Sequence, residues 1–140
     1  MEFLSVANAL KKGKGKVALR GWVYRERGSN EFKFIVLRDS TDIIQCVFKK
    51  EKFSSKDWDL LDKVSIESSM TIEGTLKEDK RAPTGYELQA ETFTVVQQAE
   101  KFPITKDQSQ EFLLDVRHLA IRSRRLAAVM KIRHTVMKAF

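Results

Sequence analysis

The sequence predicts a mainly β domain, in which five strands and one short inserted helix form a small barrel, followed by a separate amphipathic helix. Three observations predict this class. Apolar and polar residues alternate with a period of two in five stretches between residues 16 and 96. Residues 51–63 interrupt that alternation, and from residue 102 onward apolar residues recur at three- and four-residue spacing. A chain of 140 residues has room for one domain and part of another.

The N-terminal residues predict a short helix and then the first strand. Apolar residues recur there at helical spacing, at Phe3, Leu4, Ala7 and Leu10. Gly13 and Gly15 end that pattern, and from Lys16 the alternation has a period of two until a turn at residues 28–30. The segment KKGKGK at residues 11–16 is interpreted either as a flexible basic lead-in to this strand or as a phosphate-binding loop. The second interpretation lacks the strand–loop–helix setting that such loops need.

A hairpin follows the first strand. Phe32–Arg38 and Ile43–Phe48 both alternate, and the sequence Asp-Ser-Thr-Asp at residues 39–42 supplies the turn between them. The next stretch predicts a short helix, because Ser54 or Ser55 is placed to cap it.

Two more strands complete the set, and their order defines the fold. Met70–Leu76 and Tyr86–Val96 are separated by a loop that contains Pro83 and Gly85. Three strands, a short helix and two strands are the chain order of an OB-fold, a five-stranded Greek-key barrel that binds oligonucleotides or oligosaccharides on one face. An SH3-like barrel is the alternative. The inserted helix favours the OB-fold, where it closes one end of the barrel.

The predicted domain boundaries follow from these patterns. Residues 1–100 form the OB-fold domain, residues 101–116 a hinge, and residues 117–140 an amphipathic helix. Basic residues interleave with the apolar stripe of that helix. The stripe consists of Leu126, Val129, Met130, Val136, Met137 and Phe140.

Composition excludes several classes of protein and favours polyanionic partners. The net charge is +7, with +6 in residues 11–27 and +5 in residues 111–140. One cysteine and two distant histidines supply neither a disulfide framework nor an ordinary zinc site. There is no secretory signal and no long apolar run, so the chain is expected to be cytoplasmic and not membrane-bound. No catalytic fingerprint occurs in it.

The alternation in the second strand predicts a stacking residue for a nucleobase. If Ile35 and Leu37 point into the barrel, then Phe34 points outward together with Phe32 and Val36. Aromatic faces on which bases stack are a common feature of proteins that bind single strands. The alternative places Phe34 in the core and exposes Ile35.

The third strand adds a polar group to the same surface. Gln45 shares a face with Ile43 and Val47, so its amide lies where it can contact a base edge beside the outward Phe34. Glu87, at the start of the last strand, is a candidate acceptor for a base amino group; otherwise it is a solvated strand residue.

Residues 21–48, GWVYRERGSNEFKFIVLRDSTDIIQCVF, resemble the first three strands of the anticodon-binding domain of class IIb aminoacyl-tRNA synthetases, the aspartyl, asparaginyl and lysyl enzymes. The match includes Gly-Trp-Val, Arg-x-Arg, the Phe seven residues later, Leu-Arg-Asp and Ile-Gln. Two further stretches resemble asparaginyl-tRNA synthetases: EDKRAPTGYELQAETFTVV, and FPITKDQSQEFLLDVRHLAIRSRRLAAVMKIR at the hinge and the start of their catalytic domain. The resemblance covers residues 16–140 and is weakest over residues 49–69.

The resemblance implies a role for each of four residues. Phe34 stacks on the central uridine of the anticodon, which the three amino acids of this subclass share. Arg27 and Gln45 contact that base or its neighbour, and Glu87 helps to read the first anticodon base. The implied partner is the anticodon loop of a tRNA with an asparagine-type anticodon. The implied parent is an asparagine-tRNA ligase, which uses ATP and Mg²⁺ and is a homodimer through its catalytic domain.

The same resemblance implies that the 140 residues stop within the first helix of the catalytic domain. They are therefore expected to be inactive alone and to hold no cofactor, and the apolar stripe of residues 117–140 is expected to fray or to self-associate. Two other hypotheses stay open. One is the N-terminal domain of an aspartyl-tRNA synthetase, and the other is a stand-alone OB-fold module that binds single-stranded nucleic acid or a protein.

Overall fold

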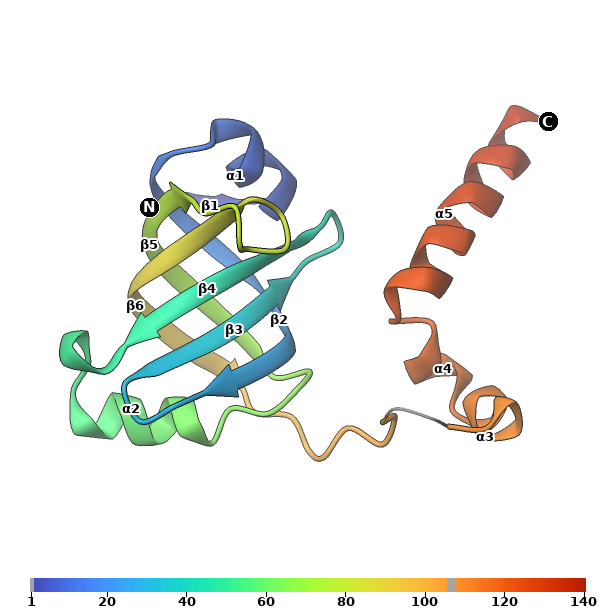
Figure 1. The fold of residues 1–140 in the computed structure, drawn as a ribbon. Coiled ribbons are helices and arrows are strands. Elements are labelled where there is room, and N and C mark those ends of the chain that lie inside the picture. The colour runs from blue at the N-terminus through green and yellow to red at the C-terminus, as the bar shows by residue number, and fades with distance from the viewer. Residues whose placement is uncertain (1, 106–107) are drawn as a thin grey trace. The chain divides into compact units, whose positions relative to one another are not determined.

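The computed structural model describes residues 2–105 and 108–140 (Figure 1). These residues divide into two compact units, Met1–Lys101 and Phe102–Phe140. Residues 106 and 107 belong to the hinge predicted over residues 101–116, and they lie outside the described residues.

In the described part of the first unit, six strands form one closed sheet. They are β1 (Phe3–Leu4), β2 (Gly15–Gly28), β3 (Phe32–Arg38), β4 (Ile43–Lys49), β5 (Ser69–Glu78) and β6 (Tyr86–Gln97). Their order is β1-β2-β3-β4-β6-β5, and β5 also pairs with the first half of β2, which closes the barrel. The β4–β6 pair is parallel. The predicted five-stranded OB-fold barrel is confirmed, with β1 as an additional strand at its edge.

The N-terminal helix begins later than the sequence predicted. Helix α1 spans Val6–Lys12, because the Ser5 side chain accepts a hydrogen bond from the backbone N–H of Asn8 and caps it there. Phe3 and Leu4 instead pair in parallel with β2 as the short strand β1. Gly13 ends the helix with a positive φ of 74°. The KKGKGK segment is thus a helix-to-strand connection, the reverse of the order that a phosphate-binding loop requires.

The helix predicted between the third and fourth barrel strands is present as α2. It spans Ser55–Asp62, after a short 3-10 turn, η1, at Lys50–Lys52. The Ser54 side chain caps it by accepting a hydrogen bond from the backbone N–H of Asp57. Trp58 and Leu61 are the buried residues of this helix, and α2 covers one end of the barrel (Figure 1).

Alternating residues of the strands build the core. Ile35 and Leu37 of β3 are fully buried, as are Ile44 and Phe48 of β4. Burial also raises the pKa of the Cys46 thiol, which makes it a poor nucleophile at neutral pH.

Two glycines let strands approach closely. A Cβ on Gly21 would lie 2.3 Å from the backbone oxygen of Arg38, and one on Gly74 would lie 2.1 Å from that of Gln89. Both contacts are far shorter than van der Waals distance. The close approach of β2 to β3 and that of β5 to β6 therefore both depend on the missing side chain.

The turn between β3 and β4 also holds the N-terminus of α1. The Asp39 carboxylate accepts hydrogen bonds from the backbone N–H groups of Val6, at 2.8 Å, and of Asp42. The Thr41 hydroxyl accepts one from the backbone N–H of Ala7. Burial by itself would raise the pKa of Asp39, but the hydrogen bonds from Thr41, Val6 and Asp42 outweigh it, so the pKa lies below its ordinary value.

Replacing Asp39 with Asn is expected to lower the free energy of unfolding by about 1 kcal/mol at pH 7, because an NH₂ group replaces one of the two carboxylate oxygens that accept hydrogen bonds from backbone N–H groups. Because the folded state lowers the pKa, the stabilisation is complete above the unfolded-state pKa of about 3.9 and is lost as the pH falls through the folded-state pKa. Urea unfolding of both proteins at pH 7 and pH 2.5 measures the difference. If the two proteins differed in their free energy of unfolding by as much at pH 2.5 as at pH 7, this assignment would be contradicted.

The described part of the second unit contains three helices where the sequence predicted one. They are α3 (Gln110–Asp115), α4 (Arg117–Ala120) and α5 (Arg124–Ala139). Ser123 interrupts the stretch, since its side chain accepts a hydrogen bond from the backbone N–H of Leu126 and starts α5 there. Ser109 starts α3 in the same way, inside the segment predicted as hinge. Among the described residues, no helix has the length and apolar character needed to cross a membrane.

Candidate nucleic-acid interface

Two neighbouring rows of residues cross the outer surface of β2, β3, β4 and β6. Strand pairing defines both rows. The first is Arg27–Phe34–Val47–Gln89, and the second is Arg25–Val36–Gln45–Glu87. We call these eight residues the reading face. All four residues that the sequence singled out lie in it, although they come from strands far apart in the chain.

Phe34 is half-buried on this face, while the next residue, Ile35, is fully buried in the core, as the alternation predicts. The Arg27 guanidinium carbon lies 5.1 Å from the centre of the Phe34 ring. Contacts of this kind at exposed sites contribute about 0.5–1 kcal/mol. The free protein therefore holds an aromatic ring with a cation resting on it at the centre of the reading face.

Gln45 is more enclosed than its outward position suggested, with 8% of its surface exposed. Its neighbours across the strands are Val36 on one side and Glu87 on the other, and these side chains flank it. Among the described residues, no hydrogen-bond partner occupies the Gln45 amide. An amide both donates and accepts, so Gln45 retains a donor and an acceptor for a base edge.

Glu87 lies beside Gln45, and a second glutamine orients it. The Gln89 side-chain N–H donates a hydrogen bond of 3.4 Å to the Glu87 carboxylate. The sequence interpretation missed Gln89. The signal was available, because Gln89 follows Glu87 by two residues in β6 and so shares its face.

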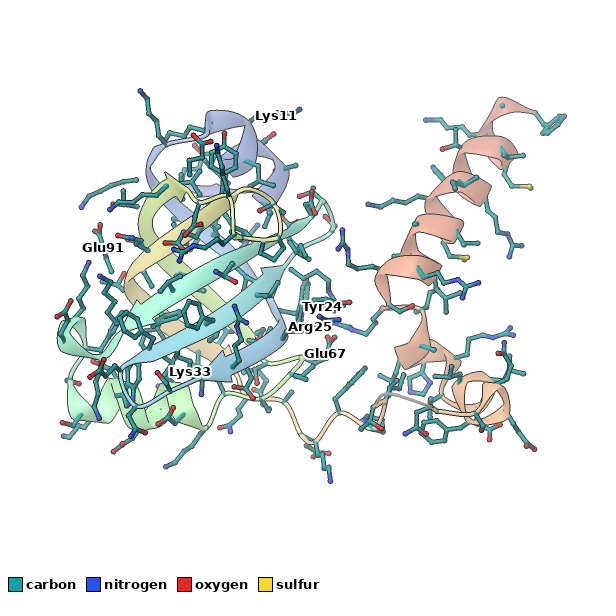
Figure 2. The ribbon with its side chains drawn as sticks, viewed as in Figure 1. Lys11, Tyr24, Arg25, Lys33, Glu67 and Glu91 are labelled. Carbon is teal, nitrogen blue, oxygen red and sulfur yellow. The ribbon has the colours of Figure 1, made fainter. Side chains whose placement is uncertain are left out.

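A second cation–aromatic cluster, around Tyr24, lies at the β2 edge of the reading face (Figure 2). The guanidinium carbons of Arg25 and Arg38 each lie 5.4 Å from the centre of the Tyr24 ring. Arg38 also donates to both carboxylate oxygens of Glu67, at 2.9 and 3.0 Å. The register shift in β2 between Val23 and Arg25 sets Tyr24 apart from the regular pairing.

A different kind of contact joins β2, β5 and β6. Lys16 of β2 forms an ion pair of 2.9 Å with Glu91 of β6, and Thr75 donates a hydrogen bond of 2.7 Å to the same carboxylate. The hydrogen bond from Lys16, followed by that from Thr75, lowers the pKa of Glu91. Part of the basic charge near the N-terminus is thus neutralised within the barrel.

The loop between β5 and β6 is closed by its own hydrogen bonds. The backbone N–H of Asp79 donates to Gly85, and Arg81 donates from its guanidinium to the Asp79 carboxylate. The hydrogen bond from Arg81 lowers the pKa of Asp79 to about 2. Within residues 2–105 and 108–140, no group of three or more His, Cys, Asp or Glu side chains is arranged to hold a metal ion.

The reading face combines an aromatic platform, arginines, and amide or carboxylate groups on the outside of an OB-fold barrel. Modules that bind nucleic acid use these same groups. Comparison with known families agrees, because residues 17–96 match the model of the OB-fold nucleic acid binding domain. The chain belongs to this family.

Individual proteins show a more specific similarity than the family model does. The chain is 50% identical over 125 residues to an asparagine–tRNA ligase of Thermoplasma acidophilum, and 54% identical over 124 residues to that of Thermococcus kodakarensis. Each match covers 89% of this chain but only 29% and 28% of the relative. The crystal structure of asparaginyl-tRNA synthetase from Pyrococcus horikoshii complexed with asparaginyl-adenylate matches with a TM-score of 0.89 and 36% identity, over 99% of this chain and 33% of that one. The resemblance to asparaginyl-tRNA synthetases is confirmed, and the chain spans less than a third of its curated relatives.

Proposed function

We propose that the barrel recognises the anticodon loop of a tRNA, with the central uridine on Phe34, as part of an asparagine-tRNA ligase. The observation that carries this proposal is the arrangement of Phe34, Arg27 and Gln45 in adjoining positions of two strand-pairing rows. The similarity to asparagine–tRNA ligases supplies the class of RNA.

Binding exchanges one contact of Phe34 for another. A base and the Arg27 guanidinium cannot share the same ring face at a separation of 5.1 Å, so Arg27 turns aside when a base arrives. Stacking contributes about 1–3 kcal/mol per base, more than the exposed cation–aromatic contact that it replaces. The released guanidinium is then free to contact a phosphate or the edge of the neighbouring base.

The polar residues of the second row read base edges. A uracil edge presents one N–H donor between two carbonyl acceptors, and the Gln45 amide offers a matching acceptor and donor. Glu87, oriented by Gln89, accepts from a base amino group, which suits the first anticodon base. Aspartyl-tRNA synthetases are the nearest alternative parents, and the relatives named above favour the asparagine enzyme.

The rest of the parent's activity is proposed on the same similarity. The full-length ligase would use ATP and Mg²⁺ for aminoacylation, act as a homodimer through its catalytic domain, and reside in the cytoplasm. This chain's contribution is to bind and orient the anticodon loop. We assign no catalytic residue to it.

The experiment that tests the function compares two anticodon stem-loop RNAs that differ only in the central base, U or C. Fluorescence anisotropy at one fixed salt concentration gives both dissociation constants. We expect the central-U loop to bind at least about fivefold more tightly, the lower end of what one base-edge contact contributes. Gln45→Leu, which suits an enclosed position, should reduce this preference.

Equal binding of the two loops by the unmodified chain would overturn the proposal. Equal binding together with a steep salt dependence would instead support the alternative of an OB-fold module that binds single strands without sequence preference.

A further inference from the structure

We propose that the reading face has a second stacking position, Phe32, which takes a nucleobase next to the one on Phe34, while Lys49 contacts the phosphate of that nucleotide. This inference rests on the proposed function, because it assumes that a single-stranded RNA loop occupies the face. Its ligand is a nucleotide directly 5′ or 3′ of the central uridine.

Phe32 lies next to the reading face, on the outer surface of β3. Phe32 pairs with Lys49, directly beyond the row of Phe34 and Val47, so it extends the reading face by one row on the same outer surface. Its side chain is half-buried. The Phe32 and Phe34 ring centres are 6.4 Å apart, and the ring planes differ by only 23°. Two nearly parallel rings therefore follow each other along β3.

The spacing of the rings indicates what kind of strand fits them. Stacked nucleotides of one helical strand advance by about 3.4 Å along the axis. Rings that are 6.4 Å apart are too far separated for two bases that stay stacked on each other. They suit bases that have been splayed out, which is how proteins read single-stranded loops.

Lys49 lies over the ring of Phe32, as Arg27 lies over the ring of Phe34. Its ammonium nitrogen lies 5.9 Å from the centre of the Phe32 ring. The next residue, Lys50, has its ammonium 5.9 Å from the Trp58 ring and its backbone N–H bonded to the Glu31 carbonyl, so the β4 end beside Phe32 is basic and ordered by hydrogen bonding. A lysine beside an aromatic platform is placed to meet the phosphate of a stacked nucleotide.

The test uses the intact 140-residue chain and three stem-loop RNAs with a central U. One is unmodified, one has an abasic nucleotide directly 5′ of the U, and one has it directly 3′. We expect Phe32→Leu to weaken binding of the unmodified loop about fivefold. The loss should disappear with one of the two abasic loops, since that RNA has no base to stack. Phe32→Tyr keeps the ring and should bind like the unmodified chain.

Lys49→Gln is the second variant, and it does not depend on the packing of Phe32. Removing one phosphate contact should reduce the slope of log affinity against log salt by about 0.7. Circular dichroism melting curves verify that each variant is folded.

The inference is overturned if Phe32→Leu binds the unmodified loop like the parent chain, or if it weakens all three loops by the same factor. An unchanged salt slope in Lys49→Gln overturns the phosphate contact. The central-U preference is measured in the same titrations. If it is present while Phe32→Leu has no effect, only the second stacking position fails; if it is absent, the proposed function fails and this inference with it.

Discussion

Replacing Phe48 with Ala is expected to lower the free energy of unfolding of the barrel by about 3–5 kcal/mol. The Phe48 side chain is fully buried in β4, with its ring centre 5.7 Å from that of Phe53 and 5.6 Å from that of Phe93. Alanine would remove the one fully buried ring of this three-ring cluster and leave a cavity that the surrounding strands can close only in part. Urea unfolding followed by circular dichroism measures the loss.

A matched control is Phe140→Ala, because Phe140 is a fully exposed phenylalanine at the end of the second unit. That change should leave the unfolding of the barrel within about 0.5 kcal/mol of the parent chain. If Phe48→Ala were as mild as the control, the aromatic cluster would not be the central part of the core.

The barrel was predictable because local sequence and tertiary burial agree. The strand predicted at Phe32–Arg38 has the same bounds in the structure, since alternate residues face a solid core on one side and the reading face on the other. Strand β1 was not predictable. It has only two residues and depends on pairing with Ala18 and Leu19, a contact that leaves no periodic pattern in the sequence.

The C-terminal helices are the opposite case, because the predicted single helix is longer than any of the three helices in the described part of this unit. The apolar stripe begins at Leu126, after Ser123, but the predicted helix extended back to residue 117 as one element over residues 117–140. A serine that bonds to the backbone three residues later begins a new helix, whatever the apolar spacing around it. Capping chemistry decided this boundary.

The reading face was predictable in part. Alternation placed Phe34 outward, but it could not show that Arg27 rests on the ring, because that contact depends on the register of β2 with β3. The enclosure of Gln45 depends on Glu87, a residue 42 positions later that only the parallel β4–β6 pairing brings alongside. Residues that act together across strands need the register, which no single strand contains.

The structure also changes how the net charge should be understood. Of the charge of +7, residues 111–140 carry +5 and belong to the second unit. In the N-terminal basic segment, Lys16 is paired with Glu91, and Lys12 donates to the backbone oxygen of Lys16. Two arginines and one glutamate give the reading face a net charge of only +1. We therefore expect stacking and base-edge contacts to contribute more than overall charge to the selectivity proposed for this face, because overall charge attracts any polyanion.

Replacing Phe34 with Ala is expected to weaken binding of a central-U anticodon stem-loop by about 1–3 kcal/mol, or roughly 5- to 150-fold. The variant loses the platform for the base and leaves Arg27 without its ring, while the buried residues on either side are untouched. The loss should shrink strongly for a loop whose central nucleotide is abasic, because that RNA has no base to stack. Fluorescence anisotropy with both loops measures the two ratios.

Phe3→Ala is the matched control for this variant, since Phe3 is another surface phenylalanine with an arginine on its ring. The Arg20 guanidinium carbon lies 5.5 Å from the Phe3 ring centre, close to the 5.1 Å of the Arg27–Phe34 pair. Phe3 lies in β1, outside the reading face, so its loss should leave the affinity unchanged. If both variants weakened binding equally, a general aromatic or fold effect would explain the result, and Phe34 would have no special part in holding the central base.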